Sequence, residues 1–380
     1  MHLPSAILQE RLRTAVAAEC PEADPDSILV RPCPDPKFGD YQATALMGLA
    51  KARRVNPRQL AAQVLARLEV GDLCEAVEVA GPGFVNFRLH PQTVADAVAA
   101  AAGQELPFVL PAARPRTIIV DFSSPNVAKP MHVGHIRSTI LGDCLARVLR
   151  RLGHRVITDN HLGDWGTQFG MLLLGWKRFL NRENLARDAI AEMERIYKTV
   201  HAACQQDPAT LEAARRELVL LQSGDPENRA IWQEMTARSR AEFDRVYDRL
   251  GVRFDYTLGE SFYHPRLQPM VDELVRLGLA RDSEGAKVIF FDDLPELKDT
   301  PLIVQKSDGA FNYATTDLAT LAYRIETWHP DEILYVTDGR QQLHFRQVFA
   351  AFRKWRPETA HVKLVHVWFG SILGENGKPF

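Results

Sequence analysis

The sequence predicts an α/β fold, in which a doubly wound parallel sheet with a helical insertion follows a small α+β domain. Three observations support this prediction. Residues 117–122 (TIIVDF) form a nearly continuous apolar run, as in a strand buried on both faces of a parallel sheet. A helical pattern at 133–152 and a second strand at 155–159 follow in βαβ order. Residues from about 170 to 250 carry almost only helical periodicity.

The first domain is predicted to span residues 1–110 and to be the small α+β unit. Helices are expected at 4–20, 43–51, 57–68 and 91–102, and strands at 27–33, 77–80 and 84–89. Residues 103–116 contain Pro107, Pro111 and Pro115, so they are the best candidate for a linker. The second domain is expected to span 111–380, with further strands at 287–291, 302–306, 332–337 and 363–368 and helices at 315–327 and 341–355.

Composition narrows the classes of protein that fit. The 380 residues include 46 Lys+Arg and 48 Asp+Glu, which gives a net charge of −2. A protein that holds nucleic acid only through phosphates would be more basic, so any such contact would depend on local patches and shape. The five cysteines form no C-x-x-C pair, and the longest apolar stretch, 171–176, is too short to span a bilayer. We therefore expect a soluble, reduced, cytoplasmic protein without a targeting segment.

The stretch most informative about chemistry runs from Asp121 to His135 (DFSSPNVAKPMHVGH). It joins the carboxyl end of the first buried strand to the start of a helix, which is where ligands bind in open α/β sheets. The first turn of a helix offers free N–H groups and a positive partial charge, both suited to phosphate. His132 and His135 share one face of that turn. Gly134 lets a flat ring approach the backbone, and Lys129 can place a charge over a polyphosphate.

This stretch also has two other interpretations. The H-x-x-H spacing could be half of a zinc site, but no third Cys or His has a matching local spacing. The two histidines could also mark no more than the solvated start of a helix. We favour a site for a nucleoside triphosphate, and we expect no metal site built by the protein.

Several long strings then carry a family resemblance. SSPNVAKPMHVGHIRSTILGD, followed by NHLGDWGTQFG at 160–170, resembles the class I aminoacyl-tRNA synthetases and the arginyl-tRNA synthetase family in particular. Further strings occur in that family's order: GESFYH (259–264), SDGAFNYATTDLA (307–319), DGRQQLHF (338–345) and ILGENGKPF (372–380). The resemblance covers nearly the whole chain. It implies a Rossmann-like catalytic domain that joins arginine to tRNA(Arg) through arginyl-adenylate, with ATP and Mg²⁺ as substrate and no tightly bound cofactor.

The resemblance implies that the arginine carboxylate attacks the α-phosphorus of ATP. Such a reaction needs positioning and stabilisation of charge rather than a protein nucleophile. The catalytic residues that the resemblance assigns are Lys129, His132 and His135. The ATP-binding residues that it assigns are Lys129, His132, Gly134, His135, His161, Gly163, Asp164 and His344.

The resemblance also assigns an arginine pocket, in which carboxylates meet the five-donor guanidinium and neutral groups set its orientation. Tyr313 and Asp317 would contact the guanidinium; they are four residues apart, so they point to one side of a helix. Glu260, expected at the end of a strand, would be a further acid. The residues for the α-amino and carboxylate end would be Asp121, Asn126 and Gln341.

Each of these residues also has a structural interpretation. Tyr313 could be a core aromatic residue, and Asp317 could be a helix cap or a solvated acid. Glu260 could be an acid without a role in the pocket. Asn126 follows a proline and could be a turn residue.

In the first domain, the string GPGFVNFRL (81–89) resembles the extra domain that arginyl-tRNA synthetases place before the catalytic fold. In the family this domain meets the D-loop at the elbow of tRNA. Phe84 could stack on an unpaired base, and Asn86 could hydrogen-bond to its edge. Strand alternation would place both on one face together with Arg88. The alternative for Phe84 is a position in the core.

The chain departs from the family's pattern at its end. It stops at Phe380, before the loop equivalent to the K-M-S-K-S signature and before the helical domain that contacts the anticodon. Half of the ATP clamp would then be absent, and the family generally needs bound tRNA to activate arginine. We therefore expect this polypeptide alone to be inactive or nearly so. We also expect a monomer whose partners are tRNA(Arg), L-arginine and ATP, and no membrane.

Two other functions remain open from the sequence. One is another nucleotidyl transferase with the H-x-G-H pattern found at 132–135, or a class I synthetase for a different amino acid. The acidic pocket disfavours a small apolar amino acid as the substrate. The other is a non-catalytic RNA-binding module derived from a synthetase, which the intact pairs His132/His135 and Tyr313/Asp317 disfavour.

Overall fold

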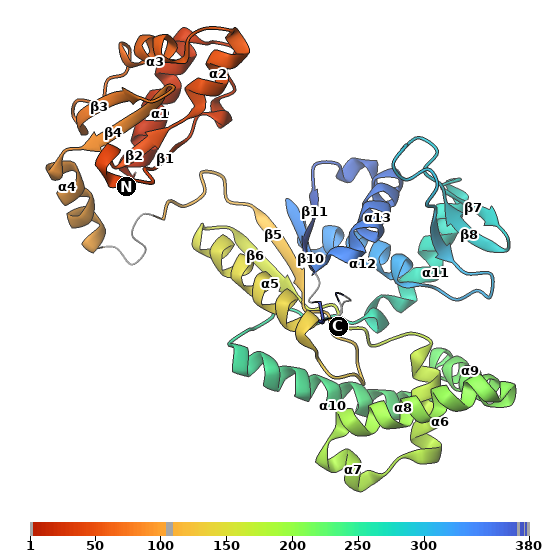
Figure 1. Ribbon diagram of the computed structural model, residues 1–380. Helices are drawn as coiled ribbons and strands as arrows, with labels where there is room; N and C mark the ends of the chain where they lie inside the picture. The colour runs from red at the N-terminus through yellow and green to blue at the C-terminus, as the bar shows by residue number, and fades with distance from the viewer. Residues whose placement is uncertain (1–2, 104–108, 371–372, 376, 378–380) are drawn as a thin grey trace. The chain divides into compact units, whose positions relative to one another are not determined.

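The computed structural model describes residues 3–103, 109–370, 373–375 and 377 (Figure 1). Part of the predicted linker, 104–108, and most of the string at 372–380 therefore lie outside the described residues. The chain divides into two compact units, Met1–Pro111 and Ala112–Phe380. No helix in the described ranges is long and apolar enough to cross a membrane.

The first unit is a four-stranded antiparallel sheet packed against helices. Its sheet has the order β1-β2-β4-β3. The elements are α1 (Pro4–Glu19), β1 (Val30–Pro32), β2 (Tyr41–Ala43), α2 (Ala45–Arg53), α3 (Pro57–Leu65), β3 (Cys74–Ala80), β4 (Phe84–Leu89) and α4 (Pro91–Ala102). Val85 and Phe87 of β4 are buried with Leu8, Leu12 and Leu60 of the helices. Alternate residues of β4 therefore build the core of this unit.

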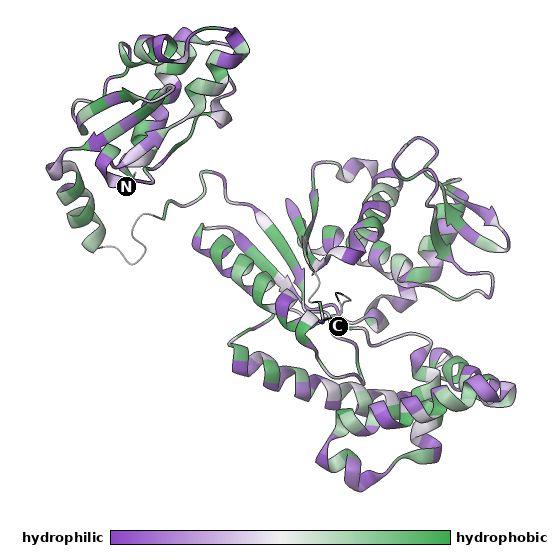
Figure 2. Cartoon of the chain, viewed as in Figure 1, coloured by the Kyte–Doolittle hydropathy of each residue, from purple (hydrophilic) through white to green (hydrophobic). Residues whose placement is uncertain are grey.

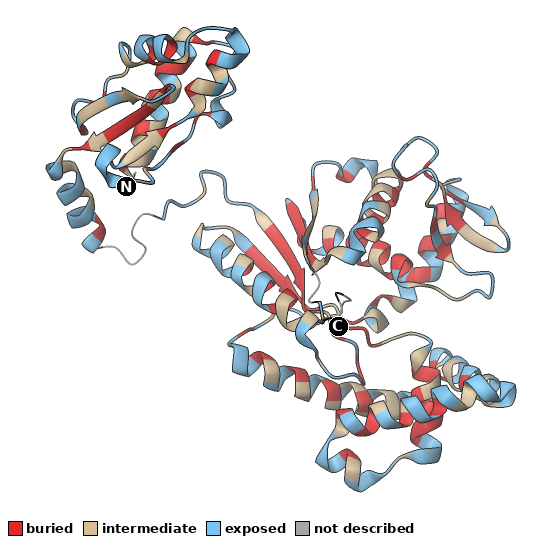
Figure 3. Ribbon diagram, viewed as in Figure 1, coloured by how far each residue is buried: buried red, intermediate tan, exposed pale blue. Residues whose placement is uncertain are grey.

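The second unit contains a parallel sheet with the order β11-β10-β5-β6, which confirms the predicted doubly wound fold. Its strands are β5 (Thr117–Phe122), β6 (Arg155–Asp159), β10 (Glu332–Asp338) and β11 (Lys363–Phe369). The helices that pack on it are α5 (Val133–Arg151), α12 (Tyr313–Trp328) and α13 (Gln342–Trp355). Figure 3 shows the central strands largely buried and the outer faces of the helices exposed.

The two faces of this sheet bury alternate residues of β5. Val120 and Phe122 pack with Ala146 of α5, whereas Ile119 packs with Leu318 of α12 on the opposite face. The apolar strands stand out in Figure 2 between the mixed surfaces of the helices. This double burial is the physical reason for the continuous apolar run at 117–122.

A helical insertion follows β6 and the loop after it. It comprises α6 (Gln168–Phe179), α7 (Arg182–Arg187), α8 (Ala189–Gln206), α9 (Pro208–Ser223) and α10 (Pro226–Leu250), drawn in yellow-green to green in Figure 1. Its own core contains Phe169, Met193 and Met235. The insertion therefore has an apolar centre separate from that of the sheet.

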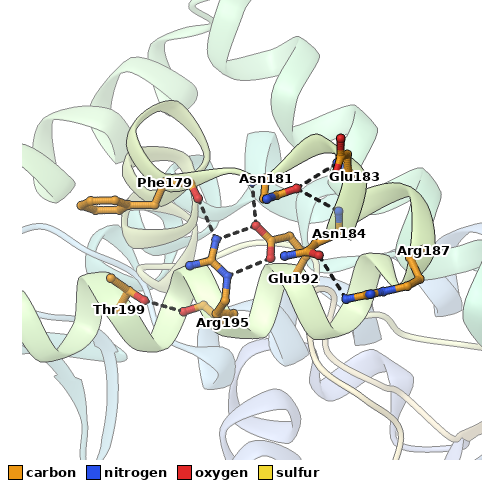
Figure 4. Close-up of polar contacts among 8 residues, drawn as sticks. All are labelled: Phe179, Asn181, Glu183, Asn184, Arg187, Glu192, Arg195 and Thr199. Carbon is orange, nitrogen blue, oxygen red and sulfur yellow. Dashed lines mark hydrogen bonds and ion pairs between the residues drawn. The ribbon is translucent and has the colours of Figure 1, made fainter.

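An ion pair within α8 also makes hydrogen bonds to the end of α6 and to the residue before α7 (Figure 4). The guanidinium of Arg195 donates from Nε to Glu192 Oε2 at 2.8 Å and from Nη2 to Glu192 Oε1 at 2.6 Å. Arg195 also donates to the carbonyl of Phe179, and the N–H of Asn181 donates to Glu192 Oε1. The hydrogen bonds from Arg195 hold the pKa of Glu192 below its usual range. The turn between α6 and α7 is thus fixed to α8.

A second, small sheet was not predicted. Its strands β7 (Ala280–Ser283), β8 (Ala286–Ile289) and β9 (Leu302–Gln305) are antiparallel and follow α11 (Glu260–Arg276). The expected strands at 287–291 and 302–306 belong to this sheet and not to the parallel one. The turn between β7 and β8 uses Glu284 and Gly285, both with positive φ, as hairpin turns of two residues require.

The carboxyl ends of β5 and β6 are joined by a buried arginine. Asp121 and Asp159 are register partners in the parallel pair. Arg324 of α12 is 0% exposed and donates from Nη2 to Asp121 Oδ2 at 2.6 Å and to Asp159 Oδ2 at 2.8 Å. Its guanidinium also lies 5.3 Å from the centroid of the Tyr335 ring. One cation therefore compensates two neighbouring buried carboxylates and fixes α12 to the edge where the strands end.

Replacing Arg324 tests this arrangement. Arg324→Met should lower the free energy of unfolding by about 3–5 kcal/mol at neutral pH, because it leaves two buried carboxylates without their cation. Burial without a compensating cation favours the protonated form of a carboxyl group, and burial already raises the pKa of Asp159. The deficit should therefore shrink on acidification toward about pH 5, as followed by urea denaturation.

The matched control is Arg266→Met. Arg266 pairs with Glu326 across α11 and α12, but both side chains are largely exposed. Its replacement should cost less than about 1 kcal/mol. An Arg324→Met variant as stable as this control, or a deficit that grows at low pH, would contradict the role assigned to the buried ion pair.

Candidate active site

His132 and His135, the histidines of the H-x-G-H motif at 132–135, cap the start of α5. We call the segment 123–131 before them the signature loop. The Nδ1 atom of His132 accepts from the N–H of Gly134 at 3.1 Å, and the Nδ1 atom of His135 accepts from the N–H of His132 at 3.2 Å. The ring centroids are 3.9 Å apart. Because each Nδ1 accepts, each neutral ring carries its proton on Nε2. The pair therefore offers two side-chain N–H donors at the positive end of the α5 dipole, an arrangement suited to phosphate. The backbone N–H groups of Gly134, His135 and Ile136 are already bonded within this turn.

Burial, with a smaller contribution from His132, lowers the pKa of His135 to about 4. His135 is therefore neutral at physiological pH. It can donate a hydrogen bond to a phosphate oxygen without adding a charge that titrates near pH 7.

Lys129 lies on the insertion side of the signature loop. With Pro130 and Met131 it lines a cavity of about 290 Å³. Its other walls include Asp188, which caps α8, Glu194 of α8 and Glu242 of α10. The Nζ atom of Lys129 is 5.9 Å from the centroid of the Tyr197 ring. The predicted contact between Lys129 and phosphate stays a prediction.

The loop between β5 and the histidines contains three non-glycine residues in the left-handed region. Ser123, Ser124 and Ala128 have φ of 75°, 50° and 62°. Each such residue costs about 1–2 kcal/mol relative to ordinary backbone. Each of the three donates its N–H to a side-chain oxygen at 3.0 Å; the acceptors are Ser138 Oγ, Asn160 Oδ1 and Ser239 Oγ, in that order. Side chains from three other segments thus hold the loop.

The loop after β6 pairs with the signature loop. The N–H of Val127 donates to the carbonyl of Gly163 at 3.0 Å, and the N–H of Gly163 donates to the carbonyl of Pro125 at 3.1 Å. A Cβ at position 163 would lie 2.1 Å from Oδ1 of Asn126, so a larger residue there would displace the Asn126 side chain. Asn126 and Gly163 are therefore brought together. The predicted role of Gly163 toward ATP stays a prediction.

Asp164 and His161 face inward from the same loop. Asp164 is buried and accepts from both the N–H and the hydroxyl of Ser261, at 2.8 and 2.7 Å. The ring of His161 lies 5.4 Å from that of Tyr263. Both carboxylate oxygens of Asp164 thus already have donors, and the residue joins the loop to the first turn of α11.

A second cluster lies at the start of α12 and of α13. Oδ2 of Asp317 is 2.6 Å from Nε2 of His344, and the rings of His344 and Tyr313 are 4.9 Å apart. Tyr313 is 66% exposed, which excludes a core position. The N-cap of α12 is Asn312, so Asp317 is not the helix cap. Tyr313, Asp317 and His344 are therefore brought together, with Tyr313 exposed and the other two side chains mostly buried.

Glu260 is the first residue of α11, so the expectation that it ends a strand was wrong. The preceding Gly259 leaves no room for a Cβ beside Asp164, which would lie 2.2 Å away. Burial, followed by the charges of Asp164 and Asp317, raises the pKa of Glu260 to about 8. Glu260, Asp164 and Asp317 thus form a group of acids from three elements that can compensate a cation.

The other predicted residues are more dispersed. Asp121 is already engaged by Arg324, and its Oδ1 accepts from Ser124 Oγ. Gln341 lies exposed in a short 3₁₀ turn before α13. In the first unit, Phe84 is half-buried, whereas Asn86 is 4% exposed and its Oδ1 accepts from Gln42.

Residues that hold the site were missed from the sequence. Arg324 and the hydroxyls of Ser138, Ser239 and Tyr247 contact the loops from distant segments. The single usable signal was Arg324, a lone charge within the apolar helical pattern at 318–325. A buried charge of this kind needs a partner.

Comparisons with known proteins cover both units of the chain. The family described as tRNA synthetases class I (R), catalytic domain, matches residues 103–380. The arginyl tRNA synthetase N terminal domain matches residues 6–89. The chain is 46% identical over its full length to an arginine–tRNA ligase of Thermosynechococcus vestitus, of which it covers 65%. It is 43% identical over 99% of its length to the arginine–tRNA ligase of Escherichia coli, again covering 65%.

Solved structures give the same result for the fold. The arginyl-tRNA synthetase of Plasmodium falciparum superimposes with a TM-score of 0.80 at 27% identity, over 98% of this chain and 66% of that one. The arginyl-tRNA synthetase of Thermus thermophilus has the same fold, with a TM-score of 0.77 at 22% identity, over 99% of this chain and 68% of that one. The chain thus spans about two thirds of the length of these relatives, and it belongs to the arginyl-tRNA synthetase family of class I tRNA synthetases.

Proposed function

We propose that the chain carries the amino-acid and ATP sites of an arginine–tRNA ligase, at the carboxyl edge of the parallel sheet. The observation that carries this proposal is the group of acids formed by Glu260, Asp164 and Asp317 beside the accessible Tyr313. A planar guanidinium is matched by carboxylate oxygens, and an aromatic ring can stack on its face. A small apolar amino acid would leave these acids without compensation.

The ATP end of the site would lie at the start of α5. The Nε2–H donors of His132 and His135, together with the positive end of the α5 dipole, suit the phosphates of ATP, bound with Mg²⁺ as substrate. The arginine carboxylate would attack the α-phosphorus, pyrophosphate would leave, and arginyl-adenylate would form. Positioned neutral donors stabilise the developing charge, with no protein nucleophile. Lys129, His161, Gly163, Asp164 and His344 are proposed as further ATP contacts.

Asp121, Asn126 and Gln341 are proposed to receive the α-amino and carboxylate end of arginine. Asp121 and Asn126 lie on the segment that leads from β5 to the histidines, so this end would point toward ATP. The guanidinium would then lie toward α11 and α12. This orientation brings the reacting carboxylate to the phosphate site.

The partner of the adenylate is proposed to be tRNA(Arg). In the first unit, the half-buried Phe84 and the neighbouring Asn86 are proposed to meet unpaired bases at the tRNA elbow. Because the Asn86 amide oxygen already accepts from Gln42, its amide nitrogen is the group left for a base. The free cysteines suit a reducing cytoplasm, and we propose that the protein acts there as a monomer.

Calorimetry with arginine, lysine and citrulline tests the amino-acid site. The chain should bind arginine and should bind citrulline, which has the same shape without the charge, roughly 100-fold more weakly. Asp317→Asn should weaken arginine binding by a similar factor, because it removes a charged acceptor without changing shape. Asp299→Asn, at an exposed aspartate, is the matched control and should leave the affinity unchanged.

Equal affinity for arginine and citrulline would refute the acidic guanidinium site. Absence of any amino-acid binding would favour the alternative of a non-catalytic RNA-binding module. Preference for lysine would indicate a class I synthetase for another amino acid.

The pH dependence of arginine binding tests Glu260. In the free chain the pKa of Glu260 is about 8, so the group is mostly protonated at neutral pH. A bound guanidinium stabilises the ionised form, so binding releases a proton. Arginine affinity should therefore rise by roughly tenfold between about pH 6.5 and 8. The dissociation constant and the proton release are measured by calorimetry in buffers of different ionisation enthalpy.

Glu260→Gln should remove both the proton release and most of this pH dependence. Glu296→Gln, at an exposed glutamate, should retain them. Arginine affinity that falls as the pH rises through this range would show that Glu260 does not meet the guanidinium.

A further inference from the structure

The signature loop is held from the helical insertion at two points. At one end, Ser239 Oγ of α10 accepts from the N–H of Ala128 at 3.0 Å and donates to the carbonyl of Met235. At the other end, the hydroxyl of Tyr247 lies 2.7 Å from Ser123 Oγ and accepts from Asn160 Nδ2 at 3.1 Å. Both contacts are buried. Ala128 and Ser123, the two residues contacted, have positive φ. Asn160, which also contacts Tyr247, accepts from the N–H of Ser124, the third residue with positive φ.

Apolar contacts follow the same route. Val127 and Ala128 are buried within the hydrophobic core of the insertion, together with Phe169 of α6 and Met235 of α10. The middle of the loop is thus packed into the insertion and not into the core of the parallel sheet. The insertion supplies both the polar and the apolar support of this segment.

The next residues of the loop are supported less. Lys129, Pro130 and Met131 line the cavity of about 290 Å³ that separates them from α8 and α10. The path from the fixed segment 123–128 to the histidines therefore runs past an open space. The position of His132 depends on how firmly the segment before the cavity is held.

We propose that Ser239 and Tyr247 of α10 are positioning residues that hold segment 123–128 in its left-handed conformation and so set the ATP-binding end of the site. This inference rests on the proposed function, because it takes the start of α5 to be the ATP site. Neither residue touches the substrate. They act through Ala128, Ser123 and Asn160, and displacement of α10 would loosen all three together.

The experiment compares Ser239→Ala and Tyr247→Phe, each made separately, with the unsubstituted chain. The matched control is Thr236→Val: this hydroxyl is also buried on α10, but it has no hydrogen-bond partner in the ranges that the structure covers. Two quantities are measured. One is the hydrogen exchange of the amides of Ser123, Ser124 and Ala128, and the other is the affinity for a non-hydrolysable ATP analogue with Mg²⁺.

Ser239→Ala should speed exchange of the Ala128 amide, and Tyr247→Phe should speed exchange of the Ser123 and Ser124 amides, each by about tenfold. The amides of β10 and β11 should keep their rates. Affinity for the ATP analogue should fall by about fivefold to tenfold. Thr236→Val should change neither quantity. Acceleration confined to the loop separates a positioning role from general loss of stability, which would raise exchange in the strands as well.

Unchanged loop exchange in both folded variants would overturn the proposal. Faster exchange with unchanged affinity for the ATP analogue would show that Ser239 and Tyr247 hold the loop but do not set the ATP-binding end of the site. If the unsubstituted chain binds no ATP analogue, the proposed ATP site fails, and the exchange measurement still decides whether α10 holds the loop. If one variant does not fold, the other gives the same test at the opposite end of the segment.

Discussion

The buried contact of Arg324 with Asp121 and Asp159 is the interaction on which the second unit depends. It joins the two strand ends that open into the site to the helix that carries Tyr313 and Asp317. Without a cation between them, two carboxylates in register on neighbouring strands would repel at the point where the loops diverge. The positions of α12 and of the loops after β5 and β6 thus depend on one guanidinium.

The acids of the site form two groups, an inner pair bound to Arg324 and an outer group that is not. The inner acids, Asp121 and Asp159, are compensated by an arginine of the chain itself. The outer acids, Glu260, Asp164 and Asp317, have no such internal guanidinium among the described residues. Burial, followed by the charges of Asp164 and Asp317, raises the pKa of Glu260, so an ionised Glu260 is costly while no cation is present. A pocket arranged in this way has one cation already in place and suits one more.

The sequence allowed the regular framework to be predicted, because the framework follows from local patterns. The bounds of β5, β6 and α4 match the expected 117–122, 155–159 and 91–102, since continuous apolar runs and capped helical periodicity are strong signals. Strands β2 and β7 were missed, because three or four residues are too few to show alternation. The prediction for Glu260 failed because the prolines at 265 and 269 hid the helix that it begins.

The site could be predicted less completely than the framework. The histidine pair was indicated by its spacing at the start of a helix. Tyr313 and Asp317 were assigned by family resemblance, and the roles of all four residues stay predictions. The left-handed serines could not be predicted, because serine and alanine give no sign of positive φ. Ser239, Tyr247 and Arg324 contact the site from far along the chain, and no local spacing connects them to it.

Arg324 has a further consequence for the order in which the molecule folds. It follows Asp121 by 203 residues and Asp159 by 165. The first βαβ unit emerges early during synthesis, with its two strand-end acids in register and uncompensated. It reaches full stability only when α12 has been made. A contact of very long sequence separation therefore completes the part of the sheet that is synthesised first. Until then the nascent chain exposes an unfinished parallel pair, which is the stage at which aggregation competes with folding.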